Sequence, residues 1–171
     1  MDQIVNSIIT TLSAHNVSPQ IITLIISMIP LLELRGSILV AGAALQLPFI
    51  QTYITAVIGN MLPIPFILLF IEKIFKLMKK VPYIEKFPHW CERKAMSKAD
   101  QIKKYGYFGL YLFVAIPLPG TGAWTGSLLA VLLGLKRGKS LLFILLGVMT
   151  AGLVMSLISY GVLQNLIDLF R

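Results

Sequence analysis

Long apolar stretches without acidic or basic side chains dominate the chain. Three of them, 36–71, 105–135 and 140–167, contain no Asp, Glu, Lys or Arg. Each is longer than the ~20 residues that a helix needs to cross the hydrocarbon core of a bilayer. The pattern therefore predicts an all-α integral membrane protein.

Charge is scarce and unevenly placed. Charged residues make up 13% of the chain, about half of the ~25% that is usual in soluble domains. Ten of the fifteen basic residues lie in 73–104, and a second small cluster lies in 136–139. Basic loops remain on the cytoplasmic side, so we expect both clusters in the cytoplasm. We expect 73–104, and within it the connector 79–104, to lie against anionic lipid head groups. Nucleic acid is not expected as a partner.

The apolar stretch between the two basic clusters is predicted to enter the membrane and return. A single crossing of 105–135 would place Lys136 outside, against the charge rule. Helix breakers divide the stretch into arms of about 12 residues, or about 18 Å each, which reach roughly the middle of the bilayer. A re-entrant helical hairpin is therefore predicted, with one kinked helix as the alternative. The breakers are Pro117, Pro119, Gly120 and Gly122.

The first part of the chain repeats this design. Ile29-Pro30-Leu31 resembles Ile116-Pro117-Leu118, and 36–41 resembles 126–131, at an offset of about 90 residues. We therefore predict a first hairpin whose break runs from Pro30 to Gly36, and a spanning helix after each hairpin. Pro63 and Pro65 are expected to kink the first span. The predicted arms and spans are 19–30, 36–46 and 50–72 in the first repeat, and 105–116, 125–135 and 140–163 in the second.

With both basic clusters in the cytoplasm, the two hairpins enter from opposite sides and the repeats are inverted. Inverted repeats are a recurring transporter design, in which the site lies near the midplane between the halves. One membrane domain of three parts is predicted: 1–78, with an outer interfacial helix at 1–17, the connector 79–104, and 105–171. Both termini then lie outside. Because so few spans are unlikely to enclose a site alone, we expect a homodimer.

Glu33 and Arg35 lie inside the predicted first hairpin. An ionised side chain at bilayer depth costs ~3 kcal/mol on insertion scales, so the pair favours a functional site. Residues at i and i+2 point to different sides of a helix. Either the backbone is irregular here, as Pro30 and Gly36 favour, or each residue pairs with a group elsewhere in the molecule. The alternative is a structural role, in which the pair ties the hairpins together.

Polar side chains near the two breaks complete the predicted substrate-binding and ion-binding site. The return arms begin near Ser37 and Ser127, and their positive N-terminal ends can hold an anion. Glu33 can then bind a proton or Na⁺, and Arg35 a phosphate or carboxylate. Thr121 and Thr125 supply further hydroxyl groups, and the amphipathic side chain of Trp124 forms one wall of the predicted site.

The segments around both breaks resemble those of the small multidrug export protein family of bacteria and archaea. The resemblance rests on PLLELRGS at 30–37 and PLPGTGAWTG at 117–126, and it covers nearly the whole chain. It implies a transporter in the inner membrane of a prokaryote. The family's name implies drug export.

A more distant resemblance links the chain to the DedA or VTT superfamily, whose members include lipid-carrier translocases and scramblases. Pro30 and Glu33 match its acidic first hairpin, whereas Tyr105-Gly106 and Pro119-Gly120 match its second. This likeness implies a DedA-like inverted repeat of re-entrant hairpins. Arginines usually surround that Pro-Gly, and here Ala115, Gly122 and Ala123 occupy the neighbourhood. The resemblance therefore implies the architecture more than the substrate.

Three classes of function remain open. The first is a transporter of an amphipathic anion such as a polyprenyl-phosphate carrier, coupled to protons or Na⁺. The second is an exporter of lipophilic cations with proton exchange at Glu33, and the third is a scaffold without transport. An enzyme is not expected, because the apolar region holds no Ser/His/Asp set, metal-ligand cluster or paired carboxylates. No cofactor or metal is expected beyond the coupling ion.

Overall fold

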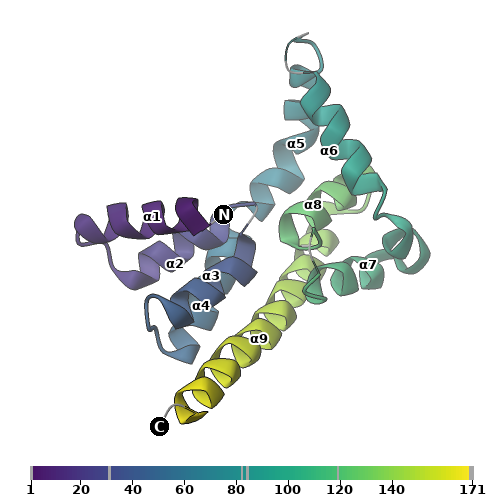
Figure 1. The fold of residues 1–171 in the computed structure, drawn as a ribbon. Helices are drawn as coiled ribbons and strands as arrows, with labels where there is room; N and C mark the ends of the chain where they lie inside the picture. Colours follow the sequence, from purple (N-terminus) through teal and green to yellow (C-terminus); the bar gives the residue numbers. More distant parts are fainter. Residues whose placement is uncertain (1, 31, 82, 84, 119, 170–171) are drawn as a thin grey trace. The chain divides into compact units, whose positions relative to one another are not determined.

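The computed structural model describes residues 2–30, 32–81, 83, 85–118 and 120–169, and every regular element in these ranges is an α-helix (Figure 1). The all-α prediction is therefore confirmed. In chain order the helices are α1 (Asp2–Ala14), α2 (Pro19–Met28), α3 (Glu33–Ala43), α4 (Phe49–Met61), α5 (Ile64–Met78), α6 (Lys86–Met96), α7 (Asp100–Ala115), α8 (Ala123–Leu132) and α9 (Arg137–Leu169).

The chain forms two compact units, and each contains one of the predicted hairpins. The first unit comprises Met1–Met61 and Met149–Arg171, and the second comprises Leu62–Val148. These limits differ from those of the predicted parts, because the two halves of α9 belong to different units. The inverted relation of the two halves stays a prediction.

In the first unit α2, α3 and α4 pack against one another. Gly59 allows the closest approach, because a Cβ atom there would lie 2.6 Å from the backbone oxygen of Leu24. Beside this contact, the Ser27 hydroxyl donates to the carbonyl oxygen of Ala56 at 2.6 Å. Gln20 contacts Gln51, so α2 and α4 run in the same direction and both end near the first hairpin tip.

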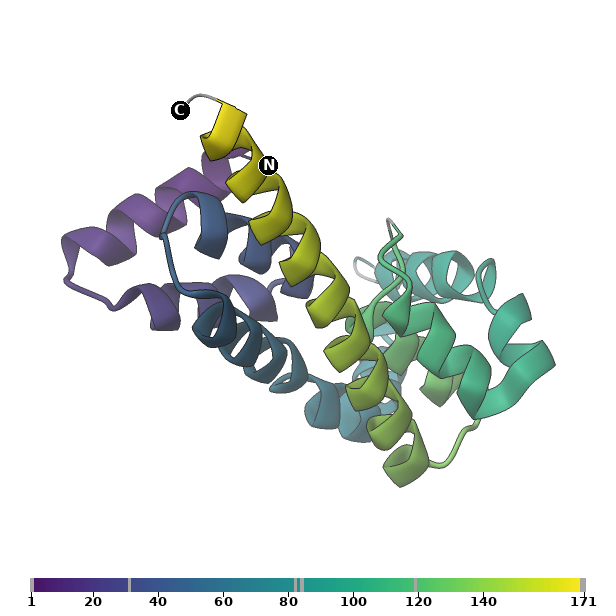
Figure 2. The ribbon, with the colours of Figure 1, turned by 90° about the horizontal axis from the view of Figure 1, so that it is seen from below.

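The yellow half of α9 lies beside α3 and α4, as both ribbon views show (Figures 1 and 2). A Cβ atom on Gly152 would meet Tyr53 and Leu34 at 3.1 and 3.2 Å. Further along α9, the Tyr160 hydroxyl lies 2.6 Å from that of Thr52. It also donates to the Leu47 carbonyl oxygen. The second half of α9 is thus fixed in the first unit by close packing and by partly buried hydrogen bonds.

In the second unit α8 lies at the centre and packs against α5, α6 and α7. Its Leu129 and Ala130 are fully buried. Glycines on α8 and α9 face the same residue of α7, since a Cβ atom on either Gly126 or Gly147 would come within 3 Å of Val114 side-chain atoms. The second predicted hairpin, α7 and α8, is therefore a closely packed helix pair.

Two segments in the described residues, Phe49–Met78 and Arg137–Gly161, are long and apolar enough to cross a membrane. Along them, apolar side chains four residues apart point outward and are about half exposed, as at Ile54 and Ile58 and at Leu153 and Leu157. Such stripes suit a hydrocarbon environment better than water. The first segment is interrupted between α4 and α5 at Pro63, whose ring leaves no N–H for a helical bond, and Pro65 lies in the first turn of α5. The predicted kink itself stays a prediction.

The predicted boundaries need three corrections. Helix α3 begins at Glu33, so Gly36 lies inside the helix, where its N–H donates to the Leu32 carbonyl oxygen at 2.8 Å. The break therefore ends earlier than predicted. Helix α8 begins at Ala123. Helix α7 begins at Asp100, with non-helical backbone at Gly106, close to the predicted start of the arm.

Candidate functional site

The tip of the first hairpin is a short turn that ends in an unusual residue. Helix α2 stops at Met28, and the N–H of Glu33 donates to the Ile29 carbonyl oxygen at 2.8 Å. Glu33 has a φ of 47°. For a residue with a Cβ atom this left-handed conformation costs roughly 1–2 kcal/mol. Such conformations persist where the surrounding structure enforces them, and they cluster at functional sites.

Glu33 is buried, with 8% of its surface exposed, and Arg35 is partly buried. The Glu33 carboxylate interacts electrostatically with the Arg35 guanidinium. Two side chains two residues apart would diverge on a regular helix. The backbone is irregular at Glu33, the first residue of α3, whereas Arg35 lies inside that helix. The way in which the two side chains pair stays a prediction. Pro30 lies in this turn and is exposed.

Polar side chains are unusually frequent in the interior of the first unit. Besides Glu33, the fully or almost fully buried polar residues of this unit are Thr23, Ser27, Ser37, Thr52, Asn60, Ser156 and Ser159. A buried polar group costs free energy unless it is hydrogen-bonded. Thr23, Ser27 and Ser37 meet this requirement through bonds to backbone carbonyl oxygens.

Asn60 is a candidate that the sequence did not reveal. It is 3% exposed, and its Oδ1 atom has no hydrogen-bond partner in the described part of the chain. Asn60 lies in the last turn of α4, at the end of the unit that also holds the first hairpin tip and Glu33. A buried carboxamide oxygen without a donor calls for an explanation such as a bound ion or ligand. The sequence neighbours of Asn60 are apolar, so the sequence gave no indication of a polar site there.

Ser37 lies in the same helix as the charged pair and is fully buried. Its hydroxyl donates to the Leu34 carbonyl oxygen at 3.0 Å. The proton of Ser37 is therefore engaged inside α3, and only its oxygen can serve a ligand.

The second hairpin tip has no acidic or basic residue of its own between α7 and α8, but the Lys98 ammonium lies against Gly120. The Thr121 hydroxyl lies 2.7 Å from the Leu118 carbonyl oxygen and 3.0 Å from that of Ile116. Gly120 has a φ of 75°, a conformation that glycine adopts without steric cost. Gly122, with a φ of 143°, precedes the first residue of α8. The predicted breaker Pro119 lies outside the described residues.

The remaining predicted site residues begin α8. Ser127 is buried, and its hydroxyl donates to the Ala123 carbonyl oxygen at 2.6 Å. Trp124 and Thr125 are partly exposed in the first turn. The second-hairpin residues thus lie in one unit, and Glu33, Arg35 and Ser37 lie in the other. The meeting of the two tips stays a prediction.

No three His, Cys, Asp or Glu side chains gather into a metal-binding group within the residues that the structure describes. The chemistry of the first tip is therefore that of a carboxylate beside a guanidinium. Such a pair can exchange a proton and can bind an oxyanion.

Comparison with known proteins gives one family. The curated proteins and the solved structures gave no match, and the relation to the DedA superfamily stays a prediction. The matched segment begins at Glu33, the last residue of the first hairpin tip, and ends at Val154, so it includes the whole second tip and about half of α9. This segment exceeds half of the chain, and it supports a membrane protein together with the two apolar spans. The chain belongs to the family described as "Putative small multi-drug export protein", whose model matches residues 33–154.

Proposed function

We propose that this protein transports an amphipathic, anionic, lipid-like substrate, such as a polyprenyl-phosphate carrier, across the membrane. The family description supports a membrane transporter. The observation that carries the proposal is the buried Glu33 carboxylate beside Arg35 at the first hairpin tip. The lipid-like substrate follows from the chemistry of that pair inside an apolar chain.

Arg35 is the proposed head-group ligand. A guanidinium presents its donors in a planar fork that matches the oxygens of a phosphate or carboxylate. Arg35 is partly buried, so one part of its side chain remains reachable from outside the unit. An apolar tail would remain in the surrounding hydrocarbon while its head group binds at the tip.

Glu33 is the proposed coupling group. With no substrate bound, its carboxylate balances the charge of Arg35. An oxyanion that binds Arg35 places a like charge beside Glu33, and a like charge favours protonation of a carboxylate. Binding of the anion is thereby linked to uptake of a proton. A sodium ion, with the Asn60 carboxamide oxygen as a further ligand, would satisfy the same charge requirement.

The second candidate function is export of lipophilic cations by proton exchange at Glu33. It is favoured by the burial of the Glu33 carboxylate and by the family description. In this mechanism Glu33 binds the cation directly, and Arg35 opposes it by charge repulsion. The two candidates therefore assign opposite roles to Arg35.

Uptake into proteoliposomes tests the proposal, with a labelled polyprenyl phosphate and a lipophilic cationic dye as the two probes. We expect Arg35→Gln to lower transport of the lipid phosphate at least tenfold and to leave the dye unaffected. Glu33→Gln should abolish the dependence of flux on a pH gradient. Exposed connector residues provide matched controls, Lys80→Gln for the arginine and Glu85→Gln for the acid.

Equal loss of both probes in Arg35→Gln would contradict the anion mechanism. Faster dye export in Arg35→Gln, without any transport of the lipid phosphate by the unsubstituted protein, would support the cation exporter instead. Normal transport of both probes in both variants would show that Glu33 and Arg35 take no part in transport. Failure of the unsubstituted protein to transport either probe would favour the scaffold. Cross-linking in native membranes tests the expected homodimer, which a purely monomeric chain would contradict.

A further inference from the structure

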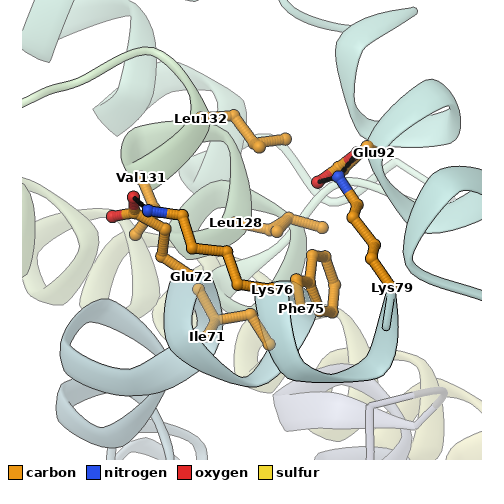
Figure 3. A pocket seen from close by; sticks show the side chains of 9 residues that line it. All are labelled: Ile71, Glu72, Phe75, Lys76, Lys79, Glu92, Leu128, Val131 and Leu132. Atoms are coloured by element: carbon orange, nitrogen blue, oxygen red, sulfur yellow. Dashed lines mark hydrogen bonds and ion pairs between the residues drawn. The ribbon is translucent and has the colours of Figure 1, made fainter. Parts of the chain in front are cut away.

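A second candidate site lies within the second unit, between α5, α6 and α8. It is a cavity of about 210 Å³. All of its lining residues belong to this unit, and Figure 3 shows them together. They are Ile71, Glu72, Phe75, Lys76, Lys79, Glu92, Leu128, Val131 and Leu132.

One side of the cavity is apolar. Leu128, Val131 and Leu132 are spaced three and four residues apart, so they lie on one face of α8. Phe75 of α5 is 6% exposed, and Figure 3 shows it with Leu128 between the two ion pairs of the cavity. This surface can cover the first methylene groups of an alkyl chain.

The other side carries two ion pairs. Lys79 Nζ contacts both carboxylate oxygens of Glu92, at 2.7 and 2.8 Å, and so joins α5 to α6. Lys76 Nζ lies 2.9 Å from Glu72 Oε1 on the same helix. The Lys79 and Glu92 side chains are 33% and 24% exposed, so this pair is the more sheltered of the two. Arg137 lies close enough to Glu72 to add positive charge.

The two lysines keep hydrogen-bond donors that an anionic guest can use. An ammonium group has three donors. Lys79 uses two on Glu92 and Lys76 uses one on Glu72, which leaves donors for further acceptors. Both oxygens of Glu92 already accept bonds from Lys79. An anion can bind the remaining lysine donors and can also compete with Glu92 for Lys79.

The volume limits what part of a guest can enter. Sites for drug-sized ligands usually enclose ~300–1,000 Å³, and this cavity is smaller. It can hold a head group and the first part of a chain, while the rest of the guest stays outside. That division matches a lipid whose tails remain in the bilayer.

We propose that this cavity binds the phosphate head group of an anionic membrane phospholipid. Lys79 and Lys76 contact the phosphate oxygens, and Phe75, Leu128 and Leu132 contact the start of the acyl chains. The Lys79–Glu92 pair is the closed form of the site, and the phosphate competes with Glu92 for Lys79. The site is separate from Glu33 and Arg35, and it does not depend on what the protein transports.

Binding of short-chain lipids to the full chain in a neutral detergent tests this proposal by native mass spectrometry. The probes are dioctanoyl phosphatidic acid, dioctanoyl phosphatidylcholine and inorganic phosphate. The measurements are repeated with Arg35→Gln, so that lipid phosphate bound at the proposed transport site is not counted. We expect phosphatidic acid to bind at least tenfold more tightly than either of the other probes.

Variants of the ion pair should change the affinity for phosphatidic acid in opposite directions. Lys79→Gln removes a charge-assisted hydrogen bond and should weaken binding about tenfold. Glu92→Gln frees Lys79 and should strengthen binding several-fold. Val131→Phe narrows the cavity and keeps all four ion-pair residues, so it should weaken binding even if the ion-pair variants fold poorly. Lys73→Gln, on the same helix but outside the cavity, is the matched control with unchanged affinity.

Three results would overturn the proposal. Equal weakening in Lys79→Gln and Glu92→Gln would make the pair purely structural. Equal binding of phosphatidic acid and phosphatidylcholine would remove the requirement for the anion. Inorganic phosphate that binds as tightly as phosphatidic acid would make this a site for a free anion instead of a lipid. All three results leave transport at Glu33 and Arg35 untouched.

Discussion

The two hairpin tips solve the same geometric problem in different ways. Each must reverse the chain between two helices in a protein dominated by apolar residues. The second tip uses Gly120 in a left-handed conformation and closes its loop with the Thr121 hydroxyl. The first tip places Glu33, a residue with a long charged side chain, in the same region of backbone conformation.

The difference shows that the first tip lowers the stability of the fold, whereas the second does not. A glycine at position 33 would make the same turn without steric cost and without a buried carboxylate. The first tip retains Glu33 and sets it beside Arg35. The turn of the second tip needs no buried carboxylate, so the comparison indicates that the acidic chemistry lies at the first tip.

The largest expected effect concerns the packing that supports the first tip. In Gly59→Ala the new Cβ atom would lie 2.6 Å from the Leu24 carbonyl oxygen, and backbone cannot move aside as a side chain can. We expect the free energy of unfolding to fall by about 3 kcal/mol, the upper end for overpacking. Titration with sodium dodecyl sulfate in mixed micelles measures it.

Gly138→Ala is the matched control for this substitution. Gly138 also lies in a helix, and a Cβ atom there would meet nothing within 4 Å. Its stability should stay the same or rise by up to ~1 kcal/mol through helix propensity. Equal stability of the two alanine variants would show that the α2–α4 contact does not support the first tip.

The next effect concerns the hydrogen bonds that hold α9 in the first unit. Tyr160→Phe removes the contacts of the hydroxyl with Thr52 and with the Leu47 carbonyl oxygen. At ~1 kcal/mol for each net hydrogen bond, we expect a loss of about 2 kcal/mol in the free energy of unfolding. Tyr53→Phe removes one longer, exposed bond to Met149 at 3.2 Å and should cost about 0.5 kcal/mol or less. The reverse order would contradict this account of the first unit.

A direct test of the comparison is to give the first tip the residue used in the second. Glu33→Gly relieves the left-handed strain, which is worth roughly 1 kcal/mol, and removes the carboxylate. We expect the free energy of unfolding to change by no more than about 1 kcal/mol, with pH-dependent transport lost. A stability loss well above that value, with transport intact, would assign Glu33 a purely structural role. Circular dichroism and proteoliposome flux provide the two readouts.

The sequence predicted much of this fold because its signals are long and periodic. Charge-free stretches far longer than a turn identified the spans, and Pro63 marked the break between α4 and α5. The breakers of the second hairpin also lie where α7 ends and α8 begins. Spans and helix breaks are caused by the residues at the same positions, so the sequence alone is enough to locate them.

Details of the first tip could not be predicted from local signals. The break was expected to extend from Pro30 to Gly36, but it ends at Glu33, whose left-handed conformation local propensity disfavours. Asn60 became a candidate only when the fold buried its Oδ1 atom at the end of α4. The cavity beside Lys79 and Glu92 depends on three helices, and no sequence pattern joined them.

The smallest effect separates the two threonines of the second tip. In Thr121→Val the hydroxyl bonds to Ile116 and Leu118 are lost, and because they are exposed we expect a cost of about 0.5 kcal/mol in the free energy of unfolding. Thr125→Val should leave stability unchanged, since in the described residues its hydroxyl makes no intramolecular hydrogen bond.

The Thr125 hydroxyl is therefore the one on this tip with a proton to offer a substrate. We expect transport of the lipid phosphate to fall two- to threefold in Thr125→Val and to stay normal in Thr121→Val. Reduced transport in Thr121→Val alone would mean that the shape of the second tip, and not a hydroxyl contact, governs the passage of the substrate.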